Sequence, residues 1–266
     1  MCEANVYMVR DGREELVMEK VDRIIPGEDQ EIMLESVFGE RKIVKARIRE
    51  MQLVHHRIIL DEIRTDTVIQ GSELWLEPAS DHGHFHPGDQ VILKLFKGHN
   101  MQAIPGETLE QAELFVVKDG AENKTPAIEH EGHLEVNLGE ETDGLITVYS
   151  HQPGTEEYYA KVIVEIGHHH HHGIKPLGMP LEIVPLSYSH VHLGDQYEIQ
   201  VIKDGIPLGG AEVLATYSGN RSSEYPYRLV TDEEGKARVF LSARGNWLFS
   251  VTADNITSTY TLIKSF

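Results

Sequence analysis

The sequence has a single cysteine, Cys2, among its 266 residues, so no disulfide can form within the chain. This excludes a small secreted scaffold held together by disulfides. Basic residues are also scarce, because 24 Lys and Arg stand against 43 Asp and Glu and leave a formal net charge of -19 at pH 7. Such a charge repels phosphate backbones and concentrates cations at the surface, so nucleic acid is not expected as a partner.

Long apolar runs are absent as well. No segment approaches the ~20 apolar residues of a membrane-spanning helix. The first residues, MCEANVYMVRDGR, have neither the basic stretch nor the apolar stretch of a signal peptide. From these features we expect a cytoplasmic protein without a membrane span.

Histidine, by contrast, is abundant, with 16 copies. Neutral imidazole is the side-chain group that most often binds transition metals near neutral pH. The composition therefore favours a metal-binding protein.

Residues 1–66 contain short alternating or apolar runs, and Asp11-Gly12 between two of them predicts a tight hairpin turn. We expect a small, mainly β domain there. From residue 67 the chain has longer loops and repeats itself: residues 84–90, HFHPGDQ, return as residues 190–196, HVHLGDQ, with five of seven positions identical.

Further on, residues 142–144 (TDG) are paralleled by residues 231–235 (TDEEG), each before another predicted strand. Short strands at regular spacing, separated by turn residues, are typical of a β-sandwich. We therefore predict two related sandwich lobes, at residues 67–167 and 180–266, joined by a histidine-rich linker at residues 168–179.

The repeated segments each hold two histidines, His84 and His86 in the first copy and His190 and His192 in the second. Residues two apart at the entrance to a strand project from the same face, about 6–7 Å apart. That spacing suits two imidazoles on one metal ion. His99, which follows the first of these predicted strands, is a further candidate.

An alternative interpretation gives the repeat a purely local role. Gly88 and Gly194, together with Asp89 and Asp195, would shape a turn. The histidines would then only flank it.

Five consecutive histidines form the middle of the predicted linker: His168, His169, His170, His171 and His172. Such a run chelates divalent nickel, copper or zinc whatever the fold. We expect it to serve as a metal buffer or entry site. His55-His56, His130, His133 and His151 are weaker candidates, for which a solvated surface or a partly buried strand position is the simpler interpretation.

Cys2 directly follows Met1, and removal of Met1 would place an α-amino group with a pKa of about 8 beside a thiol with a pKa of about 8.5. The amine and the thiolate would close a five-membered chelate ring. Two such termini in a dimer would supply an N2S2 set, which suits square-planar Ni(II) or Cu(II) better than zinc. The alternative is a small buried cysteine at the start of a strand.

Catalytic signatures are missing. The sequence has no HExxH, GxSxG or phosphate-binding glycine loop, and its many carboxylates lack a partner base. We therefore do not expect an enzyme.

The first 65 residues resemble the CooT family of small nickel-binding proteins associated with carbon monoxide dehydrogenase maturation. The resemblance is carried by MCEANVY (1–7), ELVMEKV (15–21), FGER (38–41) and HRI (56–58). It implies a small β-barrel-like domain that forms a homodimer and binds metal through Cys2.

The rest of the chain resembles nickel-uptake-associated domains of the NikK type. The resemblance is carried by LWLEP (74–78), GD (88–89), KGH (97–99) and KPLGMPLEIVP (175–185). It implies two immunoglobulin-like or transthyretin-like β-sandwich lobes. Proteins of that type are usually exported, which the expected cytoplasmic location does not match.

Together these features predict an intracellular, all-β nickel-binding protein that stores nickel or delivers it to a nickel enzyme such as carbon monoxide dehydrogenase. Copper and zinc stay open as the metal, because affinity order alone favours copper. The competing interpretation is a β-sandwich module that binds a protein partner or has a structural role and carries incidental histidines.

Overall fold

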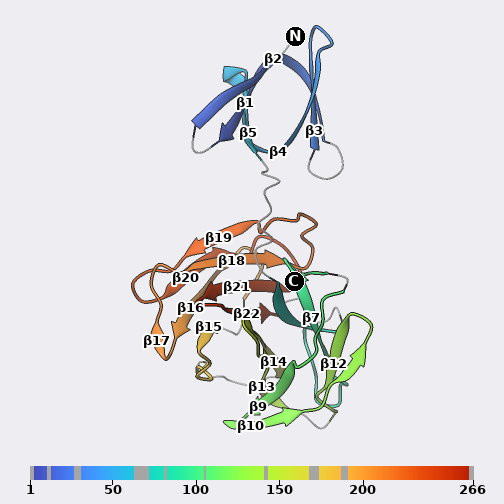
Figure 1. Cartoon of the computed structure of the whole chain (residues 1–266), viewed down its shortest axis with the longest axis vertical. Helices are drawn as coiled ribbons and strands as arrows, with labels where there is room; N and C mark the ends of the chain where they lie inside the picture. Colours follow the sequence, from blue (N-terminus) through green and yellow to red (C-terminus); the bar gives the residue numbers. More distant parts are fainter. Residues whose placement is uncertain are drawn as a thin grey trace. The chain divides into compact units, whose positions relative to one another are not determined.

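The computed structural model describes residues 3–10, 13–26, 31–62, 72–80, 83–104, 106–140, 143–167, 174–186 and 191–263. Within these residues the protein has 22 strands and one short 3-10 helix, η1 (Leu53–His55), which confirms the predicted all-β class (Figure 1). None of the described segments forms a helix long and apolar enough to cross a membrane. The chain divides into two compact units, Met1–Ile69 and Gln70–Phe266.

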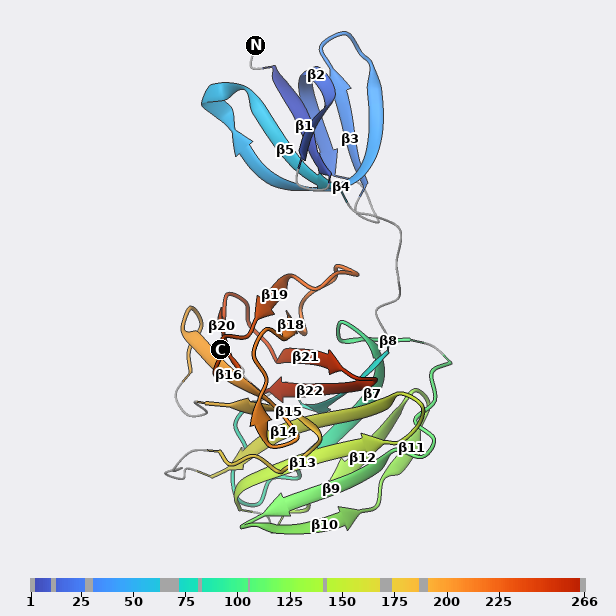
Figure 2. The same ribbon diagram turned by 60° about the vertical axis from the view of Figure 1, so that its left-hand side comes forward.

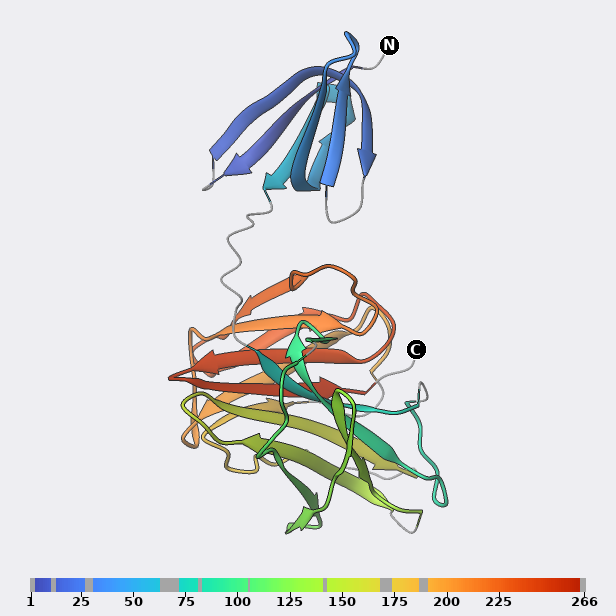
Figure 3. The same cartoon turned by 45° about the vertical axis from the view of Figure 1, so that its right-hand side comes forward.

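The first unit is a closed barrel of five strands (Figure 3). Its strands are β1 (Ala4–Arg10), β2 (Arg13–Pro26), β3 (Glu31–Ser36), β4 (Arg41–Gln52) and β5 (Arg57–Glu62). Neighbouring strands are antiparallel, and the parallel pairing of β1 with β5 closes the barrel. Alternating residues such as Val6, Met8, Leu34 and Leu60 fill its core.

The second unit begins with a β-sandwich. One layer has the order β11-β12-β7-β6, with β8 on β7, and the other contributes β10-β9-β13-β14. These strands are β6 (Glu73–Pro78), β7 (Ile92–His99), β8 (Gln102–Ala103), β9 (Glu113–Lys118), β10 (Ala121–Thr125), β11 (Ile128–His130), β12 (His133–Asn137), β13 (Gly144–Gln152) and β14 (Glu157–Ile166).

A second sandwich follows in the same unit. One layer is formed by β15, β16, β17 and β20, and the other continues as β22-β21-β18-β19. These strands are β15 (Leu181–Pro185), β16 (Gln196–Lys203), β17 (Ile206–Pro207), β18 (Glu212–Tyr217), β19 (Tyr227–Val230), β20 (Lys236–Phe240), β21 (Trp247–Ala253) and β22 (Ile256–Leu262).

The two sandwich lobes share one sheet. β14 of the first lobe pairs in parallel with β22 of the second, so that eight strands form a continuous sheet (Figure 2). Ile163 on β14 packs into the core of the second lobe, and Ile263, after β22, packs into that of the first. The lobes therefore form one compact unit.

A buried ion pair lies between the lobes. Lys161 on β14 donates to Glu182 on β15 at 2.5 Å, and both side chains are 1% exposed. The Glu182 carboxylate also accepts hydrogen bonds from the backbone N–H groups of Leu177 and Gly178. The segment PLGMPLE, which carries part of the NikK-type resemblance, thus folds around one buried carboxylate.

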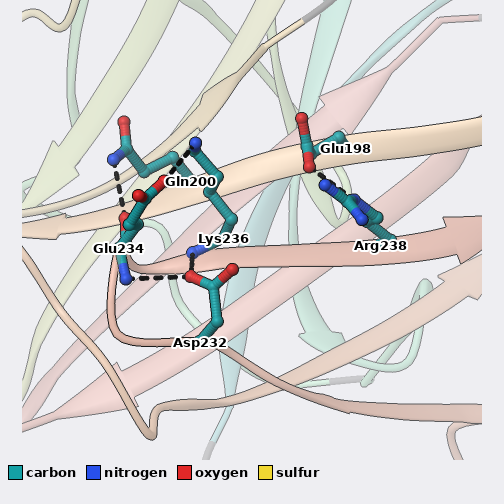
Figure 4. Close-up of polar contacts among 6 residues, drawn as sticks. All are labelled: Glu198, Gln200, Asp232, Glu234, Lys236 and Arg238. Atoms are coloured by element: carbon teal, nitrogen blue, oxygen red, sulfur yellow. Dashed lines mark hydrogen bonds and ion pairs between the residues drawn. The ribbon is translucent and has the colours of Figure 1, made fainter.

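The TDEEG segment forms the turn between β19 and β20 (Figure 4). The Asp232 carboxylate accepts hydrogen bonds from the backbone N–H groups of Glu234 and Lys236, both at 2.9 Å. Glu198 and Arg238, on neighbouring strands, form an exposed ion pair beside it. These polar contacts stabilise the turn and the outer face of the sheet.

Candidate metal-binding sites

Cys2, the most reactive of the predicted ligands, lies outside the described residues, but the chain after it is well fixed. The Asn5 N–H donates to the carbonyl of His56 at 2.8 Å, and Asn5 pairs with Arg57 on β5. Barrel closure therefore holds the start of β1 beside the exposed His55-His56 turn.

The first histidine pair flanks a buried phenylalanine. Phe85 is 7% exposed and forms a parallel bridge with Ile166 at the end of β14, whereas His84 and His86 are exposed. Both imidazoles line an open surface hollow of about 590 Å³, together with Asp89. The alternation that places them on the solvent side is the one expected two residues apart.

The repeated residues build the same turn twice. In the first copy the Asp89 carboxylate accepts from the His86 N–H at 2.7 Å, and Gly88 has φ +96. In the second, Asp195 accepts from the His192 N–H at 2.8 Å, and Gly194 has φ +89.

This turn accounts for the glycine and aspartate of the repeat, as the alternative interpretation had it. The His192 imidazole is exposed, and its Nδ1 lies 3.4 Å from the Asp195 carboxylate of the same turn. His190 lies outside the described residues, and metal binding by either pair stays a prediction.

The backbone brings the first pair close to the start of the five-histidine run. The Gly167 N–H donates to the Phe85 carbonyl at 2.8 Å, and His168 is the next residue in the sequence. Residues 168–172 themselves lie outside the described part. Gly167, the residue before the run, is thus held beside the first pair, about eighty residues away in sequence.

His99 lies at the end of β7 and is half-buried. Its ring contacts that of Tyr225 edge to face, with centroids 5.2 Å apart, and both line a small cavity of about 100 Å³. Burial lowers the pKa of His99 below its usual 6.5, so the imidazole is neutral at physiological pH. A neutral imidazole is the form that binds metal.

The same cavity contains Glu73, which the sequence analysis missed. Glu73 is 2% exposed, and its Oε1 accepts hydrogen bonds from the Asn100 N–H at 2.8 Å and from the Tyr225 hydroxyl. Burial raises the pKa of this carboxyl, and hydrogen bonds from Tyr225, Ser250 and Asn100 oppose the shift. The only signal in the sequence is a glutamate opening the apolar run ELWL.

His130 and His133 face each other across a two-residue turn. Each Nε2 lies within hydrogen-bond distance of Glu135, at 3.2 and 3.1 Å, and the rings stack 5.0 Å apart. His133 also stacks on Phe96, which stacks on Trp75. These two histidines therefore end a row of stacked rings, a role that spacing in the sequence did not reveal.

Among the described residues, no group of three or more His, Cys, Asp or Glu side chains is arranged to hold a metal ion. Ligand sets that include Cys2, His190 or residues 168–172 fall outside that statement.

Comparison with protein families gives two matches. Residues 1–61 match the family described as CO dehydrogenase accessory protein CooT, and residues 69–255 match one described as Domain of unknown function (DUF4198). The first match agrees with the resemblance noted in the sequence. The second does not carry the NikK-type label, which stays a prediction. Comparison with curated proteins found no match.

Solved structures similar to this chain include the crystal structure of putative CooT from Carboxydothermus hydrogenoformans, at 44% identity over 24% of this chain and 100% of that one, with a TM-score of 0.23. The D0-D1 domain of Intimin matches at 15% identity over 73% of this chain and 100% of its own, with a TM-score of 0.23. Murine CEACAM1b matches at 11% identity, 72% and 98% coverage and a TM-score of 0.22.

Proposed function

This chain belongs to the family described as Domain of unknown function (DUF4198), and from its CooT-like first unit we propose that it is a non-catalytic nickel-binding protein. It stores nickel or delivers it to a nickel enzyme such as carbon monoxide dehydrogenase. Copper and zinc are the competing metals, because each binds the same thiolate and imidazole ligands.

The observation that carries this proposal is that the CooT match spans a complete folding unit. Residues 1–61 lie within the compact unit Met1–Ile69, which has a closed barrel and a core of its own. A whole accessory domain, rather than a shared fragment, precedes the second unit. In this proposal Cys2 supplies a thiolate ligand, as the resemblance to the CooT family implies.

The second unit contributes imidazoles. His84 and His86 line an open hollow beside Gly167, from which the five-histidine run continues. We propose that the run captures nickel and that three other groups add further sites of modest affinity: His84 with His86, His190 with His192, and His99. Exchange through several such sites suits a protein that passes its metal on.

Unit 1 also exposes apolar side chains that favour contact with a protein. Phe38 is 79% exposed, Val54 87%, Ile43 61% and Met51 55%. This supports contact through the first unit, in a homodimer or with another protein. The second candidate function, a β-sandwich interaction module with incidental metal affinity, would use the second unit instead. Scattered exposed apolar residues are common, so nickel binding has to decide between the two.

A transfer assay tests delivery. Nickel-loaded protein is mixed with nickel-free carbon monoxide dehydrogenase in the presence of a chelator that removes free nickel, and recovered activity is followed. We expect activation by the loaded chain and at least ten-fold less by a loaded Cys2→Ser variant. If the loaded chain activates the enzyme no more than chelated nickel alone does, the delivery role is wrong. Nickel storage and the interaction module would then be the two functions still open.

A further inference from the structure

The small cavity between the two sandwich lobes is a built polar site rather than a packing gap. We call it the inter-lobe cavity; it is lined by Glu73, His99, Glu212, Leu214, Tyr225, Ser250, Thr252 and Thr257. Glu73 and His99 come from β6 and β7 of the first lobe, whereas most of the others lie on strands β18, β21 and β22 of the second.

The contact between the lobes around this cavity is polar and ordered. Thr259 on β22 donates to the carbonyl of Leu74 at 2.6 Å, and the Asn100 side chain donates to the carbonyls of Ser222 and Glu224. Asn100 itself is fully buried. These bonds fix the end of β7 and the loop before β19, so the cavity wall is held in place without a ligand.

The electrostatics of the cavity favour a cation. The described residues that line it include two carboxyl groups and no lysine or arginine. Glu212 is already paired with Arg228 at 3.2 Å, so Glu73 is the carboxyl group that a cation would meet. Glu73 is buried without a basic partner among the residues that hydrogen-bond it. A buried carboxyl group in this state costs free energy, which a bound cation would offset.

The volume limits the ligand. About 100 Å³ holds roughly three waters at ~30 Å³ each, or one ion with its remaining waters. An organic substrate of ordinary size does not fit. His99 adds an imidazole nitrogen to the lining, a ligand that transition metals prefer and that calcium and magnesium do not.

We propose that the inter-lobe cavity binds one divalent transition-metal ion, with His99 and Glu73 as its two protein ligands and water completing the coordination shell. Tyr225 acts as a positioning residue, because its hydroxyl donates to Glu73 and its ring contacts His99. The choice of a transition metal rests on the proposed function, whereas the site itself does not depend on Cys2.

The test uses the full chain in a background that lacks the other proposed ligands, with Cys2→Ser, His84→Ala, His86→Ala, His190→Ala and His192→Ala, and with residues 168–172 all changed to serine. Ni(II) uptake is measured by equilibrium dialysis, and the melting temperature of the second unit is followed with and without Ni(II). Glu73→Gln and His99→Gln are compared with His151→Ala, which removes a half-buried histidine stacked on Tyr159.

We expect one nickel per chain in the background protein and in the His151→Ala control. Uptake should weaken at least thirty-fold in both cavity variants. Because the site exists only in the folded unit, a ligand at a hundred times its Kd should raise the melting temperature by about 5–10 °C. A histidine run would not do this, since it binds metal in the unfolded chain as well.

Equal uptake by the background protein and by both cavity variants would overturn the inference. So would the absence of uptake or of a melting-temperature rise in the background protein, whose cavity residues are unchanged. Neither result affects nickel binding by Cys2, which is absent from the protein under test.

Discussion

Lys161 and Glu182 form an ion pair that the two lobes bury, and each of the two side chains is 1% exposed. Burial lowers the pKa of Lys161, and the Glu182 carboxylate opposes that shift. A single change, Lys161→Met, leaves the carboxylate buried with only its backbone donors. We expect a loss of about 3–5 kcal/mol in the free energy of unfolding, measured by urea denaturation.

The double variant Lys161→Met, Glu182→Gln is the control for this pair. The neutral amide oxygen still accepts from the Leu177 and Gly178 N–H groups, so a large part of the lost stability should return. A double variant no more stable than Lys161→Met would show that the pair does not act as a unit.

Glu73 predicts a pH dependence. Burial raises the pKa of its carboxyl above the usual 4.5, so the folded state holds this proton more tightly than the unfolded chain does. Its contribution to stability is fully present below pH 4.5 and is lost as the pH rises through the folded pKa. The free energy of unfolding of the Glu73→Gln variant, measured from pH 4 to pH 8, should lack this decline. If its dependence on pH were the same as that of the parent, the prediction would be contradicted.

At the scale of elements, the repeated turn offers matched substitutions. Asp195→Ala removes the acceptor for the His192 N–H and should cost about 1 kcal/mol in unfolding free energy, whereas Asp195→Asn keeps an acceptor and should cost less. Gly194→Ala places a side chain at φ +89 and should cost about 1–2 kcal/mol. Thermal unfolding that is the same for all three variants and the parent would rule out this role.

The same turn shows which features could be predicted from the sequence. The roles of the glycines and aspartates and the exposure of His84 and His86 depend on neighbouring residues, so the sequence alone indicates them. The sequence does not reveal the partners of Glu73 and Glu182, because Tyr225 and Lys161 contact them only through tertiary packing. The parallel pairing of β14 with β22 could not be predicted either, because it joins strands that are far apart in the sequence.

At the scale of the whole molecule, the two units have separate cores, whereas the two sandwich lobes share one sheet. A fragment of residues 1–69 should therefore fold alone, and so should residues 70–266. Fragments 70–167 and 174–266 should not, since each loses the β14–β22 pairing. Circular dichroism and resistance to proteolysis check all four; independently folded lobes would contradict the shared-sheet account.

Calorimetric titration of the full chain with Ni(II) at neutral pH tests the central claim most directly. The parent is compared with Cys2→Ser and with a variant in which residues 168–172 are serine. The account predicts a tight site, at about one nickel per two chains if the first unit dimerises, that is lost in Cys2→Ser and kept when the histidine run is removed. Tight binding that survives in Cys2→Ser and disappears with the run would contradict it and favour the interaction module.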